Sequence, residues 1–215
     1  MIEVQYVKEP RPRWLLLAYK IPPEPTRTRV AIWRRIKSLG AVYLQSSVCV
    51  LPRTSDHERQ LKFLQNEIVQ ANGVADMLET AALDAKQENA IVRRFQQDRE
   101  AQYREFLGKC NDYLVDLKRE VQIRNFSFAE LQENDEDLKK LNGWLVKIKA
   151  LDFYGAPVAS EADKRLQECE HALEQYAARV YEVEQHSKRG ESREVGARGM
   201  RAHKRNHARS TRHNS

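Results

Sequence analysis

The spacing of apolar residues changes near residue 84, and this change limits the possible folds more than any other feature of the sequence. Before it, apolar residues fall in short runs closed by Pro or Gly, as in Trp14–Ile21 before Pro22. Such runs are typical of strands that alternate with short helices. From Asp84 to Gln185 they recur every three or four residues, which is the period of amphipathic helices. The 215 residues are enough for one large domain or two small ones. We therefore expect an α+β protein with a mixed part followed by a helical part.

The mixed part is expected to form a ferredoxin-like unit over residues 14–83. Strands are predicted within residues 14–21, 41–51 and 74–83, the second range holding two strands with a tight break at 45–47, and helices within residues 26–37 and 55–72. Thr26 is expected to cap the first helix, and Gly40 to end it. The resulting order is β-α-β-β-α-β, which places both helices on one face of the sheet.

Residues 84–186 are predicted to form three amphipathic helices. Their apolar stripes fit either a three-helix bundle within one chain or a coiled-coil arm of a dimer, and the short connections favour the bundle. Residues 1–13 are expected to be an N-terminal arm. Residues 187–215 have almost nothing apolar to bury and are predicted to be a disordered basic tail.

Charge is distributed unevenly along the chain, whose formal net charge is +6. Residues 1–53 hold 10 Lys/Arg against 3 Glu, and residues 187–215 hold 9 against 2, so each end carries +7. The segment between them carries −8. Basic ends attract polyanions such as nucleic acids. The alternative is that each end is simply a solvated surface.

Enzymatic chemistry finds little support in the sequence. The three cysteines lie in apolar patterns, the histidines do not pair at metal-ligand spacing, and no phosphate-binding Gly-rich loop is present. A nuclease of this fold would need a carboxylate at the end of the first strand, where Tyr19-Lys20-Ile21 stands instead. We expect no catalytic site, no metal and no cofactor. The absence of a secretory signal and of a long apolar run predicts a cytoplasmic protein with no membrane contact.

The strongest candidate site is the basic face of the first predicted helix. Its cations, all candidates for phosphate or base contacts in DNA, are Arg27, Arg29, Arg34, Arg35 and Lys37. In the alternative interpretation these side chains form ion pairs with the acidic middle of the chain.

Several motifs of the sequence resemble the amino-terminal region of ChrB, the chromate-resistance regulator family of bacteria. They are Trp14-Leu-Leu-Leu-x-Tyr, Pro22-x-x-Pro25, Arg29-Val30-x-x-Trp33-Arg34, Lys37-x-Leu39-Gly40-Ala41, Tyr43-Leu44-Gln45-x-Ser47-Val48-Cys49-x-Leu51-Pro52 and Asp152-Phe153-x-Gly155-Ala156-Pro157. The resemblance runs from about residue 12 to residue 185. Its Gln-x-Ser-Val core is also similar to that of PaaX-type repressors and of CRISPR adaptation proteins with a ferredoxin-like fold.

The resemblance implies a DNA-binding regulator of a chromate-efflux operon that contacts promoter DNA through this region. Arg29, Arg34 and Lys37 match the family motif and are assigned to DNA, and Trp33 to packing. Where the family has a C-terminal sensor domain this chain has a basic tail, so the resemblance implies a separately encoded chromate-sensing partner or a stand-alone relative with another signal. We expect a homodimer. The rival hypotheses are a protein-interaction adaptor that works with such a partner and, less favoured, a phosphodiester-cleaving enzyme.

Overall fold

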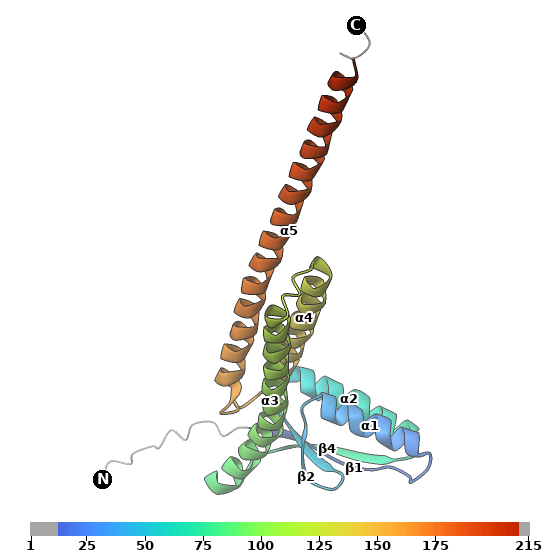
Figure 1. Ribbon diagram of the computed structural model, residues 1–215. Coiled ribbons are helices and arrows are strands. Elements are labelled where there is room, and N and C mark those ends of the chain that lie inside the picture. The colour runs from blue at the N-terminus through green and yellow to red at the C-terminus, as the bar shows by residue number, and fades with distance from the viewer. Residues whose placement is uncertain (1–12, 211–215) are drawn as a thin grey trace, which may run out of the picture. The chain divides into compact units, whose positions relative to one another are not determined.

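The α+β class expected from the sequence is confirmed by a computed structural model, which describes residues 13–210 and the side chains of residues 13–186. Most of the expected N-terminal arm lies outside these residues. Within them the chain forms one four-stranded sheet and five helices (Figure 1). The elements are β1 (Trp14–Lys20), α1 (Thr26–Ser38), β2 (Val42–Gln45), β3 (Val48–Pro52), α2 (Ser55–Gln70), β4 (Val74–Thr80), α3 (Ala85–Gln122), α4 (Phe128–Ala150) and α5 (Ala159–Ser210).

The sheet is antiparallel, with the strand order β2-β3-β1-β4. Strand β1 lies inside it and pairs Leu16 with Val50 of β3 and with Leu78 of β4. Successive side chains of a strand point to opposite faces. The apolar run of β1 therefore supplies residues to both faces of the sheet, as a central strand must when both faces are covered.

Helices α1 and α2 lie side by side on one face of the sheet (Figure 1). Leu15 and Leu17 of β1 are buried on this face together with Ile32 and Ile36 of α1. Helix α2 adds Leu61, Leu64 and Ile68 to the same core. Burying one such side chain contributes roughly 1.5–3 kcal/mol, so the two helices are attached to the sheet mainly by their apolar stripes.

The opposite face of the sheet is covered at one end by the start of α3. Trp14 and Val50 are buried there against Phe95 of α3. The indole of Trp14 donates a hydrogen bond to the Tyr154 hydroxyl at 2.8 Å, so its one polar group is satisfied although the ring is buried. This arrangement ties the loop after α4 to the sheet.

The turns that orient α1 follow local rules of sequence. Gly40 has φ +79° directly after the helix, which confirms its predicted role in ending the helix. The prediction that Thr26 caps the helix is wrong. Pro25 occupies the N-cap position in an extended conformation, and the Glu24 carboxylate accepts the Thr26 N–H at 3.2 Å. Thr26 already has helical geometry, so its side chain is one position too late to cap.

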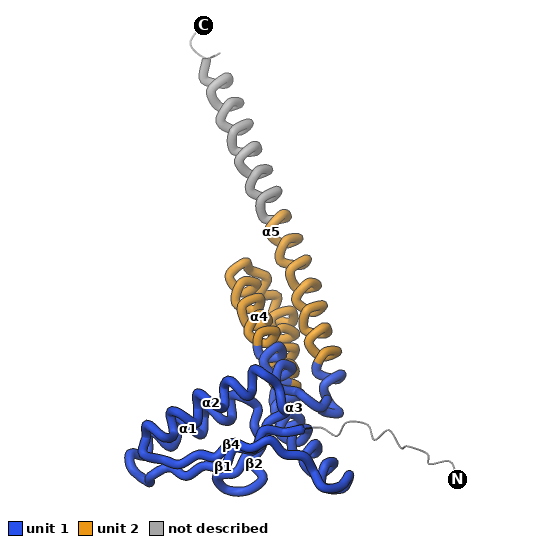
Figure 2. Tube along the Cα trace, turned by 180° about the vertical axis from the view of Figure 1, so that it is seen from behind, with its two compact units in different colours: residues 1–106, 144–162 blue, residues 107–143, 163–215 orange. Residues whose placement is uncertain are grey.

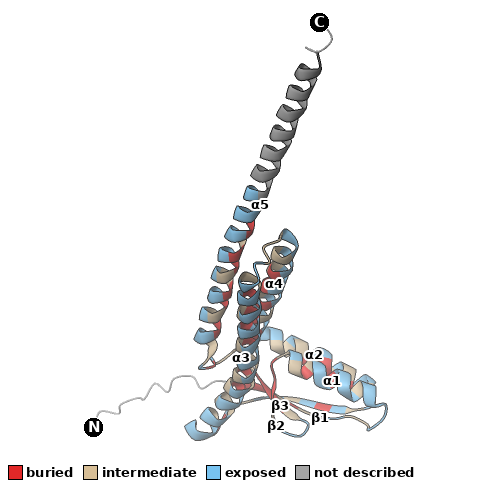
Figure 3. Cartoon of the chain, viewed as in Figure 1, coloured by how far each residue is buried: buried red, intermediate tan, exposed pale blue. Residues whose placement is uncertain are grey.

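The chain divides into two compact units (Figure 2). Unit 1 contains the sheet, α1, α2 and the adjoining ends of the long helices, over residues 1–106 and 144–162; unit 2 comprises residues 107–143 and 163–215. In unit 2, buried residues form stripes along three helical segments (Figure 3). Polar contacts join these segments: Tyr113 donates to the Asn134 carbonyl at 3.3 Å, and Asn142 donates to Glu170 at 3.0 Å.

Helix α5 differs from the expectation at its C-terminal end. Residues 187–215 are predicted to be disordered. The helical backbone of α5 is described through Ser210, and residues 211–215 lie outside the described part of the chain. The physical reason is that extending a formed helix avoids the cost of nucleation, and Arg, the most frequent residue of this segment, is a good helix former.

Replacing Gly40 with Ala tests the turn after α1. We expect Gly40→Ala to lower the free energy of unfolding by about 2 kcal/mol, because an L side chain is strained at positive φ. The new Cβ would also lie 2.9 Å from the Phe153 ring. Gly108→Ala is the matched control: it lies within α3 with no atom near the new Cβ, and should raise the same free energy by about 0.5–1 kcal/mol. Urea unfolding measures both, and equal effects of the two substitutions would contradict this account.

The burial of all three cysteines predicts their reactivity. Cys49, Cys110 and Cys169 are free and buried. Burial raises the pKa of Cys49 to about 12, and the hydrogen bond to Cys110, together with burial, raises the pKa of Cys169. The same interaction lowers the pKa of Cys110, so the protection of this thiol rests on its complete burial. Because the thiolate is the reactive form, we expect a disulfide reagent at neutral pH to label no thiol rapidly in the native protein and all three in guanidinium chloride. One rapidly labelled thiol in the native protein would show that the helices or the sheet open more easily than the packing indicates.

Candidate nucleic-acid interface

Helix α1 sets the direction of the five candidate cations. Ile32 and Ile36 are buried against the sheet. Each residue advances a helix by about 100°, so Arg27 and Arg34 lie on the side opposite these two isoleucines. Arg29, three residues before Ile32, lies on the isoleucine side of the first turn, next to the end of β1. All three arginines are exposed. Among the described residues, none of the three has a hydrogen-bond or ion-pair partner.

The other two candidates are paired with carboxylates. Arg35 forms an ion pair with Glu67 of α2, and Lys37 binds Asp98 of α3 at 2.7 Å. Both pairs are partly exposed, and pairs of this kind contribute about 0–1 kcal/mol. The structure thus separates the predicted set into three exposed arginines and two cations used in internal contacts. The ion-pair interpretation applies to the second group only.

The first turn of α1 is unusual in its charge. It contains Arg27 and Arg29 and no acidic residue, whereas each of the other four described helices has at least one acidic residue in its first turn. A helix N-terminus carries a partial positive charge, so cations there cost about 0.3–1 kcal/mol each. The Glu24 carboxylate bonded to the Thr26 N–H offsets part of this cost. The result is a concentrated positive charge at the exposed start of α1.

Trp33 is placed differently from the prediction. It was assigned to packing, yet 50% of it is exposed. It follows Ile32 directly, and the 100° rotation between neighbours moves it from the core to the flank of the helix, on the side of Arg29. The assignment of Trp33 to packing with the apolar residues of this helix is therefore wrong.

Trp33 and Arg29 border a groove beside the end of the sheet, which we call the Trp33 groove. Its volume is about 400 Å³, and it is lined by Tyr19, Lys20, Ile21, Thr26, Arg29, Val30, Trp33 and Ser47. Two of these residues are cations and none is a carboxylate. The Trp33 groove is therefore both aromatic and positively charged.

Hydrogen bonds fix the position of Tyr19, which lines the Trp33 groove. The Tyr19 N–H donates to the Ser47 carbonyl at 2.9 Å, which ties the β2–β3 turn to β1. The Tyr19 and Tyr43 hydroxyls are 2.9 Å apart and share a hydrogen bond. Burial raises the pKa of Tyr19, while the hydrogen bond from Tyr43 and the positive charge of Arg29 oppose the rise. Tyr19 is therefore a neutral phenol that interacts electrostatically with Arg29.

The sequence did not single out Lys20, Tyr19 and Ser47 as members of this site. At the end of β1 the sequence indicates only that a metal-binding carboxylate is missing. The usable signal was the shortness of the connection from Lys20 to the first turn of α1, which brings the strand end close to Arg29.

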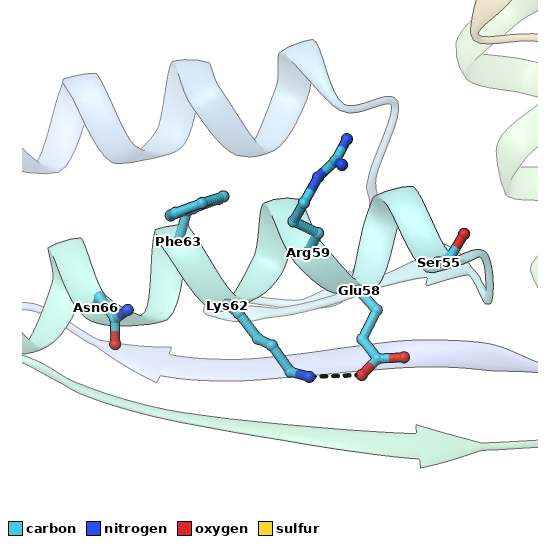
Figure 4. Close-up of a pocket in the computed structure, with 6 residues that line it drawn as sticks. All are labelled: Ser55, Glu58, Arg59, Lys62, Phe63 and Asn66. Carbon is cyan, nitrogen blue, oxygen red and sulfur yellow. Dashed lines mark hydrogen bonds and ion pairs between the residues drawn. The ribbon is translucent and has the colours of Figure 1, made fainter.

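A second groove, on α2, provides a contrast (Figure 4). Its volume is about 410 Å³, and Arg59 and Phe63 project from α2 in the opposite direction to Glu58 and Lys62. Lys62 donates to Glu58 at 2.7 Å, and this hydrogen bond lowers the Glu58 pKa. Arg59 is paired with Asp56. The cations of this groove are therefore neutralised locally, unlike those of the Trp33 groove.

Neither a metal site nor a membrane-spanning helix is present in the described part of the chain. No group of three His, Cys, Asp or Glu residues there is arranged to hold a metal ion. None of its helices combines the length and apolar character needed to cross a bilayer.

Comparison with known proteins gives a family. The family described as "Protein ChrB, N-terminal" matches residues 29–187, a range that contains Arg29, Trp33 and Arg34. Protein ChrB of Cupriavidus metallidurans is 32% identical over 98 residues, which are 46% of this chain and 30% of that protein. The match thus spans less than a third of the relative's length. Because the family match covers well over half of the chain, this protein belongs to the ChrB N-terminal family.

Proposed function

We propose that this protein is a DNA-binding transcriptional regulator that acts in resistance to chromate or a related stress. The observation that carries the proposal is the set of exposed arginines on α1. Arg27 and Arg34 lie on its outward face and Arg29 in its first turn, and none of them has a hydrogen-bond or ion-pair partner among the described residues. Membership of the ChrB N-terminal family supports the same role.

The dimensions of α1 suit a duplex. Its 13 residues make a helix of about 20 Å, and Arg27 and Arg34 are separated by about 10 Å along its axis. The major groove of B-DNA is about 12 Å wide and admits a helix. Guanidinium groups bind phosphates bidentately and can also read guanine. With its inner face buried on the sheet, α1 would present only its arginine face to the DNA.

The finer features of the proposal concern fold and assembly. We propose a ferredoxin-like unit, which the strand order β2-β3-β1-β4 supports, and a three-helix bundle formed by α3, α4 and α5. A cytoplasmic homodimer would present two copies of α1 to two half-sites of a promoter, with a spacing set by the dimer. The chromate signal would come from a separately encoded sensing protein.

Replacing the three exposed arginines tests DNA binding. The probe is a duplex of the chromosomal region directly upstream of the gene, and fluorescence anisotropy is measured at several salt concentrations. We expect Arg27→Gln/Arg29→Gln/Arg34→Gln to weaken binding at least tenfold. It should also reduce the slope of log K against log salt by up to about 2.7, because each lost phosphate contact removes about 0.9.

The control removes the same charge elsewhere. Arg59, Arg104 and Lys109 are exposed cations in short-range ion pairs on α2 and α3, and their combined change to Gln should alter affinity much less. If both triple variants weaken binding equally, net charge and not α1 drives association. If the native protein does not shift the duplex at any salt concentration while a stable protein partner is recovered, the adaptor hypothesis replaces this one.

The charge of the first turn predicts a conflict between stability and binding. Arg27→Glu should raise the free energy of unfolding by about 0.5–1 kcal/mol, because a carboxylate at a helix N-terminus is favourable where a cation is not. The same change should weaken duplex binding. The matched comparison is Arg35→Gln near the other end of α1, which loses the Glu67 ion pair and should leave stability unchanged or slightly lower. Urea unfolding and anisotropy measure both quantities, and a destabilised Arg27→Glu protein would contradict the electrostatic account.

A further inference from the structure

We propose that the Trp33 groove binds a single unpaired nucleotide of the DNA, with its base stacked on the Trp33 indole and its phosphate held by Arg29 and Lys20. This inference rests on the proposed function and adds to it a second mode of contact. Helix α1 would meet the duplex backbone through its outward arginines, while the groove at its flank would take a base that has left the stack.

The exposure of Trp33 is the first step of the argument. Half of this side chain lies in solvent although the neighbouring Ile32 and Ile36 are buried. Within the described residues no aromatic ring stacks on it and its ring N–H has no acceptor. Exposed apolar area of this size, next to polar groups, is typical of a binding surface.

The charge of the groove identifies the class of ligand. Lys20 and Arg29 line it and no carboxylate does. An apolar peptide would gain nothing from two cations, whereas a phosphate alone would gain nothing from an exposed indole. A nucleotide uses both, because every base has a face that stacks on an aromatic ring and every nucleotide carries a phosphate. This combination of a cationic groove and an aromatic platform is the pattern of single-strand recognition.

The geometry of the groove limits how the base can enter. Trp33 lies beside a cavity of about 400 Å³, within the range of small-molecule sites. Tyr19, which lines the groove, is fixed by its backbone hydrogen bond to Ser47 and by the hydrogen bond between the Tyr19 and Tyr43 hydroxyls. Paired bases present only their edges to a protein, so stacking on Trp33 requires an unpaired one.

Three versions of one DNA test the proposal. They are the upstream duplex fully paired, the same duplex with one unpaired thymine at its centre, and the same bulged duplex with an abasic sugar in place of that thymine. We expect the protein to bind the thymine-bulged duplex about tenfold more tightly than the abasic one, since stacking contributes about 1–3 kcal/mol per base. Trp33→Ala should abolish this difference and Trp33→Phe should retain most of it.

Fluorescence supplies a direct readout. Of the three tryptophans, Trp14 is fully buried and Trp144 is partly buried against Phe106. The thymine-bulged duplex should therefore quench emission in the native protein and not in Trp33→Phe. The matched control is Phe63→Ala, which removes an aromatic ring of similar exposure, 54%, from α2. It should keep the preference for the bulged thymine.

The outcomes separate this proposal from the proposed function. If the protein binds all three DNAs equally and Trp33→Ala weakens each by the same factor, the nucleotide site is wrong while DNA binding stands. If none of the three binds, the proposed function fails first. If Trp33 emission changes with protein concentration in the absence of DNA, a second copy of the chain covers the indole, and the nucleotide site is again wrong.

Discussion

The packing of Ile32 and Ile36 against the sheet is the constraint on which the candidate interface depends. Both side chains are buried with Leu15 and Leu17. Because the α-helix has a fixed rotation per residue, burying these two positions forces Arg27 and Arg34 outward. Any rotation that hid an arginine would place an unpaired charge in an apolar core, at a cost of several kcal/mol. The direction of the cations is therefore a consequence of apolar packing.

The same packing divides the cations of α1 into two groups. Arg35 and Lys37 lie on opposite flanks of α1, where Glu67 of α2 reaches Arg35 and Asp98 of α3 reaches Lys37. No carboxylate of the described residues pairs with Arg27, Arg29 or Arg34. The ion-pair hypothesis therefore describes Arg35 and Lys37, the DNA hypothesis can apply to Arg27, Arg29 and Arg34, and neither describes the whole helix.

Most of the local structure could be predicted from sequence because it has local causes. The strands of unit 1 were recognised from short apolar runs closed by Pro22 or by turns, and Gly40 from its position after an amphipathic stretch. The pairing of Arg35 with Glu67, 32 residues away, depends on tertiary packing that no local pattern encodes. The exposure of Trp33 was not predicted for a related reason. Trp33 is apolar like the neighbouring Ile32, but the 100° rotation between the two residues moves it from the core to the flank of the helix. The helical backbone beyond residue 186 was missed because composition was judged without the helix that precedes it.

The charge of the first turn of α1 supports the proposal that this surface binds an anion. Four described helices follow the favourable rule and place acidic residues in their first turn, whereas α1 places Arg27 and Arg29 there. Each such cation costs stability that a single substitution would recover. Departures from local rules without a structural gain occur mainly at functional sites. The free N–H groups of a helix start attract anions. Arg27 and Arg29 lower the stability of the free protein, and the same two charges would stabilise the proposed complex with a phosphate. The Trp33 groove, which includes Arg29 of this first turn, also departs from a general rule, because a large apolar side chain is left half exposed. The Trp33 indole lies there beside Lys20 and Arg29.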